Sequence, residues 1–459
     1  MRNQVFDVVV IGGGVVGCAA ARELSGSQLS VALLEAKDDV GDATSKANTA
    51  ILHTGFDAPP GTLEAQLVPR GYQLLTGYAA EAGIPVERTG AVLVAWSDEE
   101  LGALPGLRDK ATTNGYQSCE LITADAVYAM VPALGAGALG GMTVPDESII
   151  CPWTTTLALA TDALARGVSV LLRHDLLSVN VGESVTTLST TQGDVQCRWV
   201  VNAAGLGSDI IDRLFGHDRF TIVPRRGELL VFDKLARQLV DTIVLPVPTL
   251  KGKGVLVSPT IYGNVMLGPT SEDRSDRGDT STSEGGFAYL LDKGRRLMPM
   301  LLDEEVTASY AGLRAATEHP DYVVAIDSAK RYLVLGGIRS TGLTASMALA
   351  EHATTLLQET GVATTKRSGL PAAPRMPSIG EQTSRPFASA EAIKSDPAYG
   401  NIVCFCERVT MGEIRDAFAG PLPPSDLDGL RRRTRATMGR CQGFYCGAQI
   451  DKVLRGANR

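Results

Sequence analysis

Residues 5–35, VFDVVVIGGGVVGCAAARELSGSQLSVALLE, contain the pattern that decides the fold. The apolar run 5–11 is rich in β-branched residues, which predicts a buried parallel strand. Glycines and then a helical stretch follow it, and a second apolar run, 30–35, ends in an acid. Together these segments predict a βαβ unit at the start of the chain.

The glycines between the first strand and its helix have the spacing G-x-G-x-x-G, at Gly12, Gly14 and Gly17. Gly12 permits a tight turn, Gly14 lets the backbone approach a pyrophosphate, and Gly17 permits close packing of helix on strand. Glu35 lies at the end of the second strand, where a carboxylate can accept hydrogen bonds from ribose hydroxyls. The pattern predicts a dinucleotide site, for FAD or NAD, with a purely structural glycine turn as the alternative.

Bulk properties exclude several other classes of protein. A chain of 459 residues is too long for one compact core and suggests two or three domains. The net charge of −8 argues against general nucleic-acid binding. The apolar run at the N-terminus is too short for a signal peptide, and 18 uninterrupted apolar residues occur nowhere, so no transmembrane helix is expected. We therefore expect a cytoplasmic protein.

Four further segments carry a specific resemblance. They are T-S-x-x-N at Thr44, Ser45 and Asn48, I-L-H-T-G-F at 51–56, V-N-A-A-G at 201–205 and G-G-I-R-S-T-G-L-T at 336–344. In these motifs the chain resembles the FAD-dependent glycerol-3-phosphate dehydrogenase and L-2-hydroxyglutarate oxidase branch of the D-amino-acid oxidase superfamily. The four matches occur in the family's order over the first 360 residues.

The resemblance implies FAD as the cofactor and an α/β fold, in which a Rossmann-like FAD-binding domain is interleaved with a mixed-sheet substrate domain. Residues 1–365 form this body, with FAD-binding parts near 1–80, 150–215 and 310–365, and substrate-domain parts near 81–149 and 216–309. Beyond the glycine motif, the flavin-binding residues that it implies are Thr44, Ser45, Asn48, Ala204, Gly205, Gly337, Gly342, Leu343 and Thr344.

A flavin supplies the redox chemistry, so the protein must orient the substrate and remove a proton from its hydroxyl. Of five histidines, His53 stands alone in lying inside a flavin-family motif. It is our candidate for general base or substrate orienter, and a structural histidine beneath the flavin is the alternative. Arg314 and Arg339 are candidates for binding a substrate anion. Related glycerol-phosphate enzymes usually carry lysine at the place of Arg339, and a guanidinium binds phosphate or carboxylate, so the anion stays open.

Cysteines cluster at the end of the chain, where Cys404, Cys406, Cys441 and Cys446 give C-x-C…C-x4-C. Four soft thiolates select zinc or an iron–sulfur cluster. Segment 401–459 resembles the small helical bacterioferritin-associated-ferredoxin-like [2Fe–2S] domain, which also ends the catalytic subunit of anaerobic glycerol-3-phosphate dehydrogenases. Zinc or an empty, degenerate site are the alternatives. Residues 366–400 are read as a linker, and the arginines at 431–433 and 435 as groups that offset the cluster's charge or face a partner.

These observations predict an FAD-dependent dehydrogenase that oxidises a small anionic hydroxy compound and passes electrons through a [2Fe–2S] cluster. Glycerol 3-phosphate, oxidised to dihydroxyacetone phosphate, is the first choice of substrate, and L-2-hydroxyglutarate or another 2-hydroxy acid is the alternative. A redox-sensing flavoprotein subunit without catalysis is a third hypothesis. The predicted acceptor is a quinone or a partner redox subunit, which would place the chain at the inner face of the membrane. Oligomeric state stays open.

Overall fold

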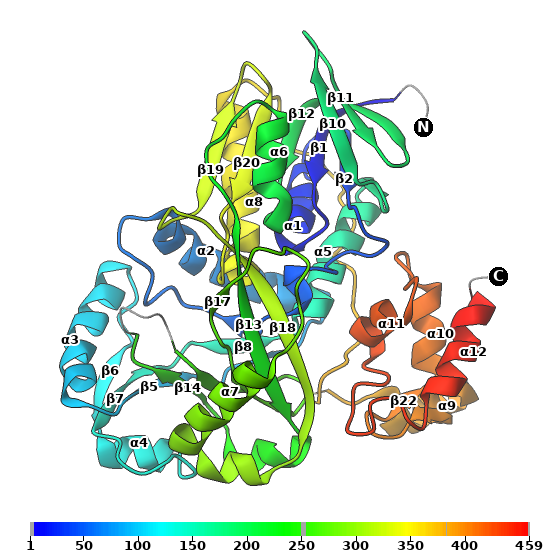
Figure 1. Cartoon of the computed structure of the whole chain (residues 1–459). Helices are drawn as coiled ribbons and strands as arrows, with labels where there is room; N and C mark the ends of the chain where they lie inside the picture. The colour runs from blue at the N-terminus through cyan, green and yellow to red at the C-terminus, as the bar shows by residue number, and fades with distance from the viewer. Residues whose placement is uncertain (1–3, 249–253, 382, 458–459) are drawn as a thin grey trace.

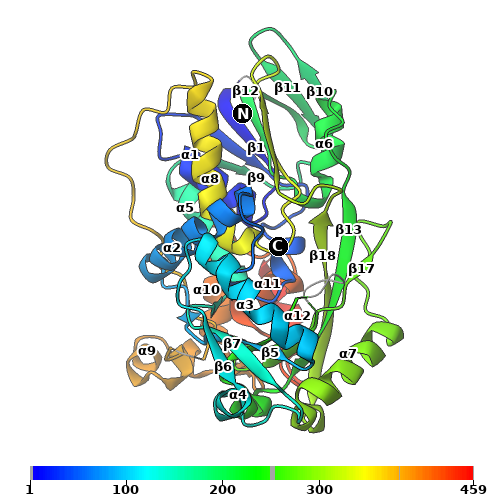
Figure 2. The same ribbon diagram turned by 90° about the vertical axis from the view of Figure 1, so that its left-hand side faces the viewer.

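The computed structural model describes residues 4–248, 254–381 and 383–457. Two large sheets with helices on their faces form the body of the molecule, and a small helical unit at the C-terminus lies against one side of it (Figures 1 and 2). The predicted fold class, an α/β body with a small helical C-terminal domain, is confirmed.

The first large sheet contains the predicted βαβ unit. Its five parallel strands run in the order β9, β2, β1, β12, β20, and an antiparallel hairpin and one further antiparallel strand extend it. The strands are β1 (Val5–Ile11), β2 (Val31–Leu34), β9 (Ser169–Leu171), β10 (Leu176–Val181), β11 (Thr186–Thr190), β12 (Gly193–Asn202), β19 (Val323–Asp327) and β20 (Tyr332–Gly336). Because β1, β12 and β20 end at one edge, three strand-to-glycine turns meet there.

The second large sheet has nine strands and is mainly antiparallel, apart from the parallel pair β5 and β14. Its longest pair is β13 with β18, which runs from Val223 opposite Ala316 to Phe232 opposite Val306. The strands are β5 (Ala91–Ala95), β6 (Glu120–Thr123), β7 (Gly140–Val144), β13 (Val223–Phe232), β14 (Ile243–Pro246), β15 (Leu256–Pro259), β16 (Val265–Gly268), β17 (Glu272–Asp273) and β18 (Val306–Ala316). A separate three-stranded sheet consists of β3 (Ile51–Leu52), β8 (Ser148–Ile150) and β4 (Val86–Glu87), in that order.

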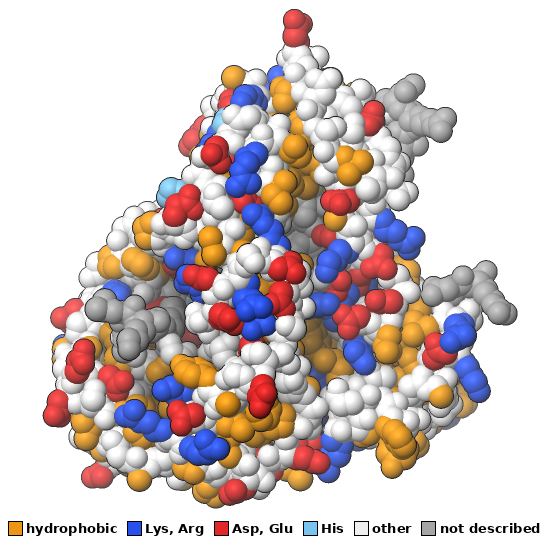
Figure 3. Space-filling model, viewed as in Figure 1, with side chains coloured by type: hydrophobic (Ala, Val, Ile, Leu, Met, Phe, Trp, Pro, Cys, Tyr) orange, Lys and Arg blue, Asp and Glu red, His pale blue; other side chains and the backbone are white. Residues whose placement is uncertain are grey.

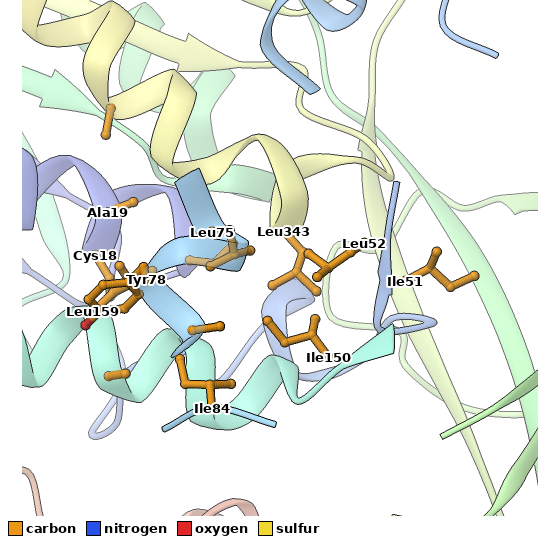
Figure 4. Close-up of a cluster of buried hydrophobic side chains, with 14 of the residues drawn as sticks. Cys18, Ala19, Ile51, Leu52, Leu75, Tyr78, Ile84, Ile150, Leu159 and Leu343 are labelled. Atoms are coloured by element: carbon orange, nitrogen blue, oxygen red, sulfur yellow. The ribbon is translucent and has the colours of Figure 1, made fainter. Parts of the chain in front are cut away.

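Helices of the body pack on these sheets through apolar faces. They are α1 (Val15–Leu24), α2 (Leu63–Ala82), α3 (Asp98–Thr113), α4 (Ala124–Met130), α5 (Pro152–Ala165), α6 (Ser208–Leu214), α7 (Glu284–Leu297) and α8 (Gly342–Glu359). Helices α1, α2, α5 and α8 enclose the largest core (Figure 4), where Cys18, Tyr78 and Leu159 pack together and Leu343 at the start of α8 contributes from above. This core holds the ends of α1 and α8 that point toward the glycine turns.

The C-terminal unit has its own small core around Val403, Ile414 and Leu430. It consists of a two-stranded sheet, β21 (Ile402–Cys404) with β22 (Val409–Thr410), and the helices α10 (Met411–Ala419), α11 (Leu427–Thr434) and α12 (Gly447–Ala457). The segment before it holds α9 (Ala390–Ser395) and short 3₁₀ turns. Across the described ranges, no helix has both the length and the apolar character needed to cross a membrane.

Candidate functional site

A cavity of about 350 Å³ opens where β1, β2, β12 and β20 end. Most of the residues predicted to bind the cofactor line it, together with the candidate Arg339. The predicted residues in its wall are Gly12, Gly14, Glu35, Thr44, Ser45, Asn48, Ala204, Gly205, Gly337, Gly342 and Leu343. His174, Asp175 and Ile210 also line it, and no motif in the sequence marked them.

The glycine turn at this cavity admits no side chain at two of its positions. A Cβ on Gly17 would lie 1.8 Å from the carbonyl oxygen of Gly12, and one on Gly12 would lie 2.5 Å from that of Ala203. Gly12 also has φ +106°, a region that favours glycine. Gly17 therefore does not touch the cavity but lets α1 press against the turn, so that the helix N-terminus points at the cavity.

Glu35 is held by two backbone donors. Its Oε2 accepts from the N–H of Gly13 at 2.7 Å, and its Oε1 accepts from that of Lys37 at 2.8 Å. Burial raises the pKa of Glu35 and outweighs these hydrogen bonds. The carboxylate is thus fixed in the wall of the cavity, and its remaining lone pairs are available to ribose hydroxyls.

The T-S-x-x-N segment is pinned to the turn and to the second sheet. Ser45 Oγ accepts from the N–H of Val15 at 2.9 Å, the first residue of α1, and Thr44 Oγ1 donates to the carbonyl of Leu313 at 2.8 Å. Asn48 donates to the carbonyl of Ser45 and accepts from the N–H of Ala50. These side chains shape the loop as much as they line the cavity, and the whole set fits an extended dinucleotide such as FAD.

His53 and Thr344 lie just behind the cavity wall. Thr344 Oγ1 accepts from the backbone N–H of His53 at 3.1 Å, which ties α8 to the segment after β3. The Nδ1 of His53 lies 3.1 Å from Oε2 of Glu147, a carboxylate that is fully buried. Sequence reasoning missed Glu147, because only the pairing of β3 with β8 brings it opposite His53.

Arg314 lies on β18, on the face that meets residues 44–48, which we call the flavin loop. Along this strand Tyr310, Gly312 and Arg314 share one face. Tyr310 donates to the carbonyl of Asn48 at 2.8 Å, and a Cβ on Gly312 would lie 2.1 Å from the carbonyl oxygen of Ala47. Arg314 is therefore close to the loop that lines the cofactor cavity.

The guanidinium of Arg314 lies close to Gly227, where an added Cβ would be 2.9 Å from Nη2 and 3.0 Å from Nη1. In the described part of the chain no carboxylate pairs with Arg314, and the residue opposite it on β13 is another arginine, Arg225. Arg225 itself is neutralised by Asp273. Burial, and then the charge of Arg225, lower the pKa of Arg314 to about 10. A half-buried, unpaired cation of this kind favours an anionic ligand.

Arg339 is engaged differently. It lines the cofactor cavity, donates to the carbonyl of Pro320, and has Nη2 3.6 Å from Oε2 of Glu64. Glu64 in turn accepts from the hydroxyl of Thr341 at 2.7 Å. This existing partner leaves Arg339 less free for a substrate anion than Arg314.

The four terminal cysteines meet as two pairs of thiols, Cys406 with Cys441 and Cys404 with Cys446. The backbone N–H of Tyr445 lowers the pKa of Cys441, which favours the thiolate that binds metal. Within the residues that the structure describes, no three His, Cys, Asp or Glu side chains gather closely enough for a single metal ion. Four thiols brought together in this way are a ligand set for a tetrahedral zinc or for a [2Fe–2S] cluster.

Of the four arginines before these cysteines, Arg432, Arg433 and Arg435 contact the body, whereas Arg431 contacts Thr437 and Asp428 within its own unit. Arg432 and Arg433 are buried and both donate to Asp39, at 2.6 to 2.9 Å. Arg432 also donates to Asp42 at 2.6 Å, and Lys46 joins Asp42 to Asp428. Figure 3 shows acidic and basic side chains gathered in this region, over α11 and the adjoining loop.

A second contact between the two units is aromatic. Arg435 lies with its guanidinium carbon 4.1 Å from the ring centroid of Tyr262 and donates to Glu407 at 2.8 Å. Tyr262 stacks on Trp153 at 4.9 Å, and Trp153 donates to the carbonyl of Lys46 at 2.9 Å. Packed side chains thus connect the flavin loop with the residue that follows Cys406.

Comparisons with known proteins identify a family for each of the two parts of the chain. The family model "FAD dependent oxidoreductase" matches residues 7–356, and "BFD-like [2Fe-2S] binding domain" matches residues 402–455. A glycerol 3-phosphate dehydrogenase of Caloramator mitchellensis is 34% identical over 98% of this chain and 94% of its own length. The mitochondrial L-2-hydroxyglutarate dehydrogenase of Bos taurus is 31% identical over 58% of this chain and 61% of its own length.

Among solved structures, the FAD-bound L-α-glycerophosphate oxidase of Mycoplasma pneumoniae superposes with a TM-score of 0.77 at 26% identity, over 82% of this chain and 100% of that one. The match to the first family and the FAD-bound relative indicate FAD as a cofactor, and the match to the second indicates a [2Fe–2S] cluster. The chain therefore belongs to the FAD dependent oxidoreductase family and carries FAD and, in its C-terminal domain, a [2Fe–2S] cluster.

Proposed function

We propose that this protein is a glycerol 3-phosphate dehydrogenase. The observation that carries the proposal is Arg314, a half-buried cation without a carboxylate partner in the described residues, which lies beside the flavin loop. It supports binding of a small anionic substrate. The relative that matches nearly the whole chain, cysteine module included, is a glycerol 3-phosphate dehydrogenase, which favours that substrate.

When bound, FAD accepts two electrons from the substrate and the cluster passes them on one at a time. The chain's own residues do the rest. Arg314 binds the phosphate, and His53, held next to the cavity by Thr344, removes the proton from the substrate hydroxyl. Arg339 takes a secondary part, because it is already tied to Glu64. The predicted flavin-binding residues hold the cofactor in the geometry described above.

Exposed aromatic side chains beside the cysteines indicate where electrons leave the protein. Phe405, Phe444 and Tyr445 lie between the cysteines and are 71%, 83% and 74% exposed. Large aromatic groups so exposed indicate a contact surface. We propose that a quinone site or a redox subunit meets the cluster there, and that such a partner accounts for any association with the inner face of a membrane. In this proposal the body, 1–365, oxidises the substrate, and the C-terminal domain, 401–459, exports the electrons. Residues 366–400 link the two.

Anaerobic mixing tests the substrate. Glycerol 3-phosphate should bleach the visible absorbance of the oxidised flavin, and glycerol, which lacks the anion, should not. L-2-hydroxyglutarate forms the second arm, because relatives acting on it match 58% of the chain. Bleaching by L-2-hydroxyglutarate alone would reassign the substrate. Bleaching by neither compound would contradict the proposal and favour a redox-sensing subunit.

A further inference from the structure

Glu147 is the one carboxylate that contacts the ring of His53 among the described residues. It lies in the turn between β7 and β8. Strands β3 and β8 pair with Leu52 opposite Ser148, so the next position along this antiparallel ladder places His53 opposite Glu147. The contact is therefore built by the register of the sheet.

Both oxygens of the Glu147 carboxylate have a partner. Oε1 accepts from the backbone N–H of Thr54 at 2.7 Å and from its hydroxyl at 3.1 Å, while Oε2 lies 3.1 Å from Nδ1 of His53. The side chain of Glu147 is 0% exposed and that of His53 is 18% exposed. In the described residues no lysine or arginine pairs with Glu147, so His53 is its one available counter-cation.

A buried charge of this kind is weak support for stability, because removing a carboxylate from water costs free energy that its partners only partly return. Its effect on a histidine is more specific. An acceptor at Nδ1 fixes the proton there and leaves the lone pair at Nε2, and an anion favours the imidazolium. No protein partner of Nε2 is found in the described residues.

We infer that Glu147 is the positioning residue of the reaction: it holds His53 as the Nδ1–H tautomer, with Nε2 free to take the substrate's hydroxyl proton. The inference rests on the proposed role of His53. In the step, the O–H bond breaks and its proton moves to Nε2, while the adjacent C–H hydrogen leaves with its bonding electron pair to the flavin, and a carbonyl forms. The imidazolium that results lies against the carboxylate of Glu147.

Among the described residues, the thiol of Cys119, just before β6, also senses the charge of Glu147. Burial, and then the charge of Glu147, raise the pKa of Cys119 to about 11, so this thiol stays neutral near pH 7. The neighbouring Asp146 faces elsewhere, because it accepts from the hydroxyl of Tyr116 at 2.9 Å. Asp146→Asn is therefore a matched control that alters an acid in the same turn without reaching His53.

The first measurement needs neither substrate nor a variant at Glu147. The ring nitrogens of the five histidines are observed by ¹⁵N NMR in the FAD-bound protein, and His53→Gln identifies the signal of His53. We expect the proton on Nδ1 in the neutral form. A proton on Nε2 would overturn the inference, whether or not glycerol 3-phosphate is the substrate.

Glu147→Gln keeps the size of the side chain and removes its charge. We expect the neutral form of His53 to lose its preference for a proton on Nδ1, as read from the ¹⁵N signals of its ring. The maximal rate of flavin reduction should fall at least about tenfold. Asp146→Asn should leave both unchanged. An unchanged tautomer of His53 in Glu147→Gln would refute the role of Glu147, even if the rate fell. Glu147→Asp keeps the carboxylate and should retain the wild-type tautomer, so it separates the acceptor from the packing of the longer side chain.

Discussion

Asp39→Ala tests whether the arginines of α11 hold the C-terminal domain on the body. Asp39 is 3% exposed and receives hydrogen bonds from Arg432 and from both terminal nitrogens of Arg433. Without it, Arg432 still reaches Asp42, but within the described ranges Arg433 keeps only the carbonyls of Leu422 and Gly429. A buried cation left without its carboxylate costs about 3–5 kcal/mol.

The assay is native-state proteolysis in increasing urea, with release of the C-terminal domain identified by mass. Asp39→Ala should lower the free energy of detaching the domain by about 3–5 kcal/mol. Asp451→Ala is the control, because its pair with Arg455 has side chains 54% and 76% exposed and should contribute about 0.3–0.5 kcal/mol. A double-mutant cycle of Asp39→Ala with Arg433→Ala should give a coupling of about 1–3 kcal/mol. The reasoning fails if Asp39→Ala costs no more than Asp451→Ala.

Three further outcomes are expected. Gly17→Ala should lose FAD, because its Cβ would lie 1.8 Å from a backbone oxygen. Gly77→Ala is the control and should keep the yellow colour of the flavin, because a Cβ there meets no atom within 4 Å. Retention of FAD by Gly17→Ala would contradict the close packing of α1 on the turn. Arg314→Gln should keep FAD but raise the KM for glycerol 3-phosphate about 30-fold or more, measured anaerobically, and a change below threefold would remove it from the anion site. Burial raises the pKa of Asp42, but its ion pairs with Lys46 and Arg432 outweigh this, so the net pKa lies below 3.8. The stabilisation of the folded state by charged Asp42 is complete above pH 3.8 and is lost as pH falls through the lowered pKa. The temperature of the thermal transition of the C-terminal domain should therefore fall below about pH 4. An unchanged transition temperature would argue against these ion pairs.

How far the sequence predicted the structure depended on the range of the interaction. The βαβ unit depends on contacts between residues at most about 35 positions apart. Its strands and glycines could be predicted because the apolar run of the strand, the glycine turn and the start of the helix follow one another directly in the sequence. Helix α5 begins at Pro152, and the sulfur of Cys151 accepts the capping hydrogen bond from the backbone N–H of Thr154. A cysteine is an unusual cap, so its pattern gives no signal.

Long-range partners could not be predicted. Asp39 and Arg433 are 394 residues apart, and Glu147 reaches His53 across 94 residues through the pairing of two short strands. The sequence shows that a run of arginines is charged, but it does not show which acids the fold brings against it. For the same reason Arg314 and Arg339 looked equivalent, and only the contacts of Glu64 and the strand register at Arg225 separate them.

The loop 38–48 is where the two halves of the chemistry meet. One side of it lines the flavin cavity through Thr44, Ser45 and Asn48. Its other side carries Asp39 and Asp42, which the C-terminal domain binds. Buried ion pairs return little net stability, but each fixes the direction and distance of its partners. Passing single electrons between two centres needs a fixed separation more than a large binding energy, and a hydrophobic contact of the same area would allow sliding that bidentate pairs do not. The pairing of arginines with this loop therefore suits a domain that must stay at one distance from the flavin.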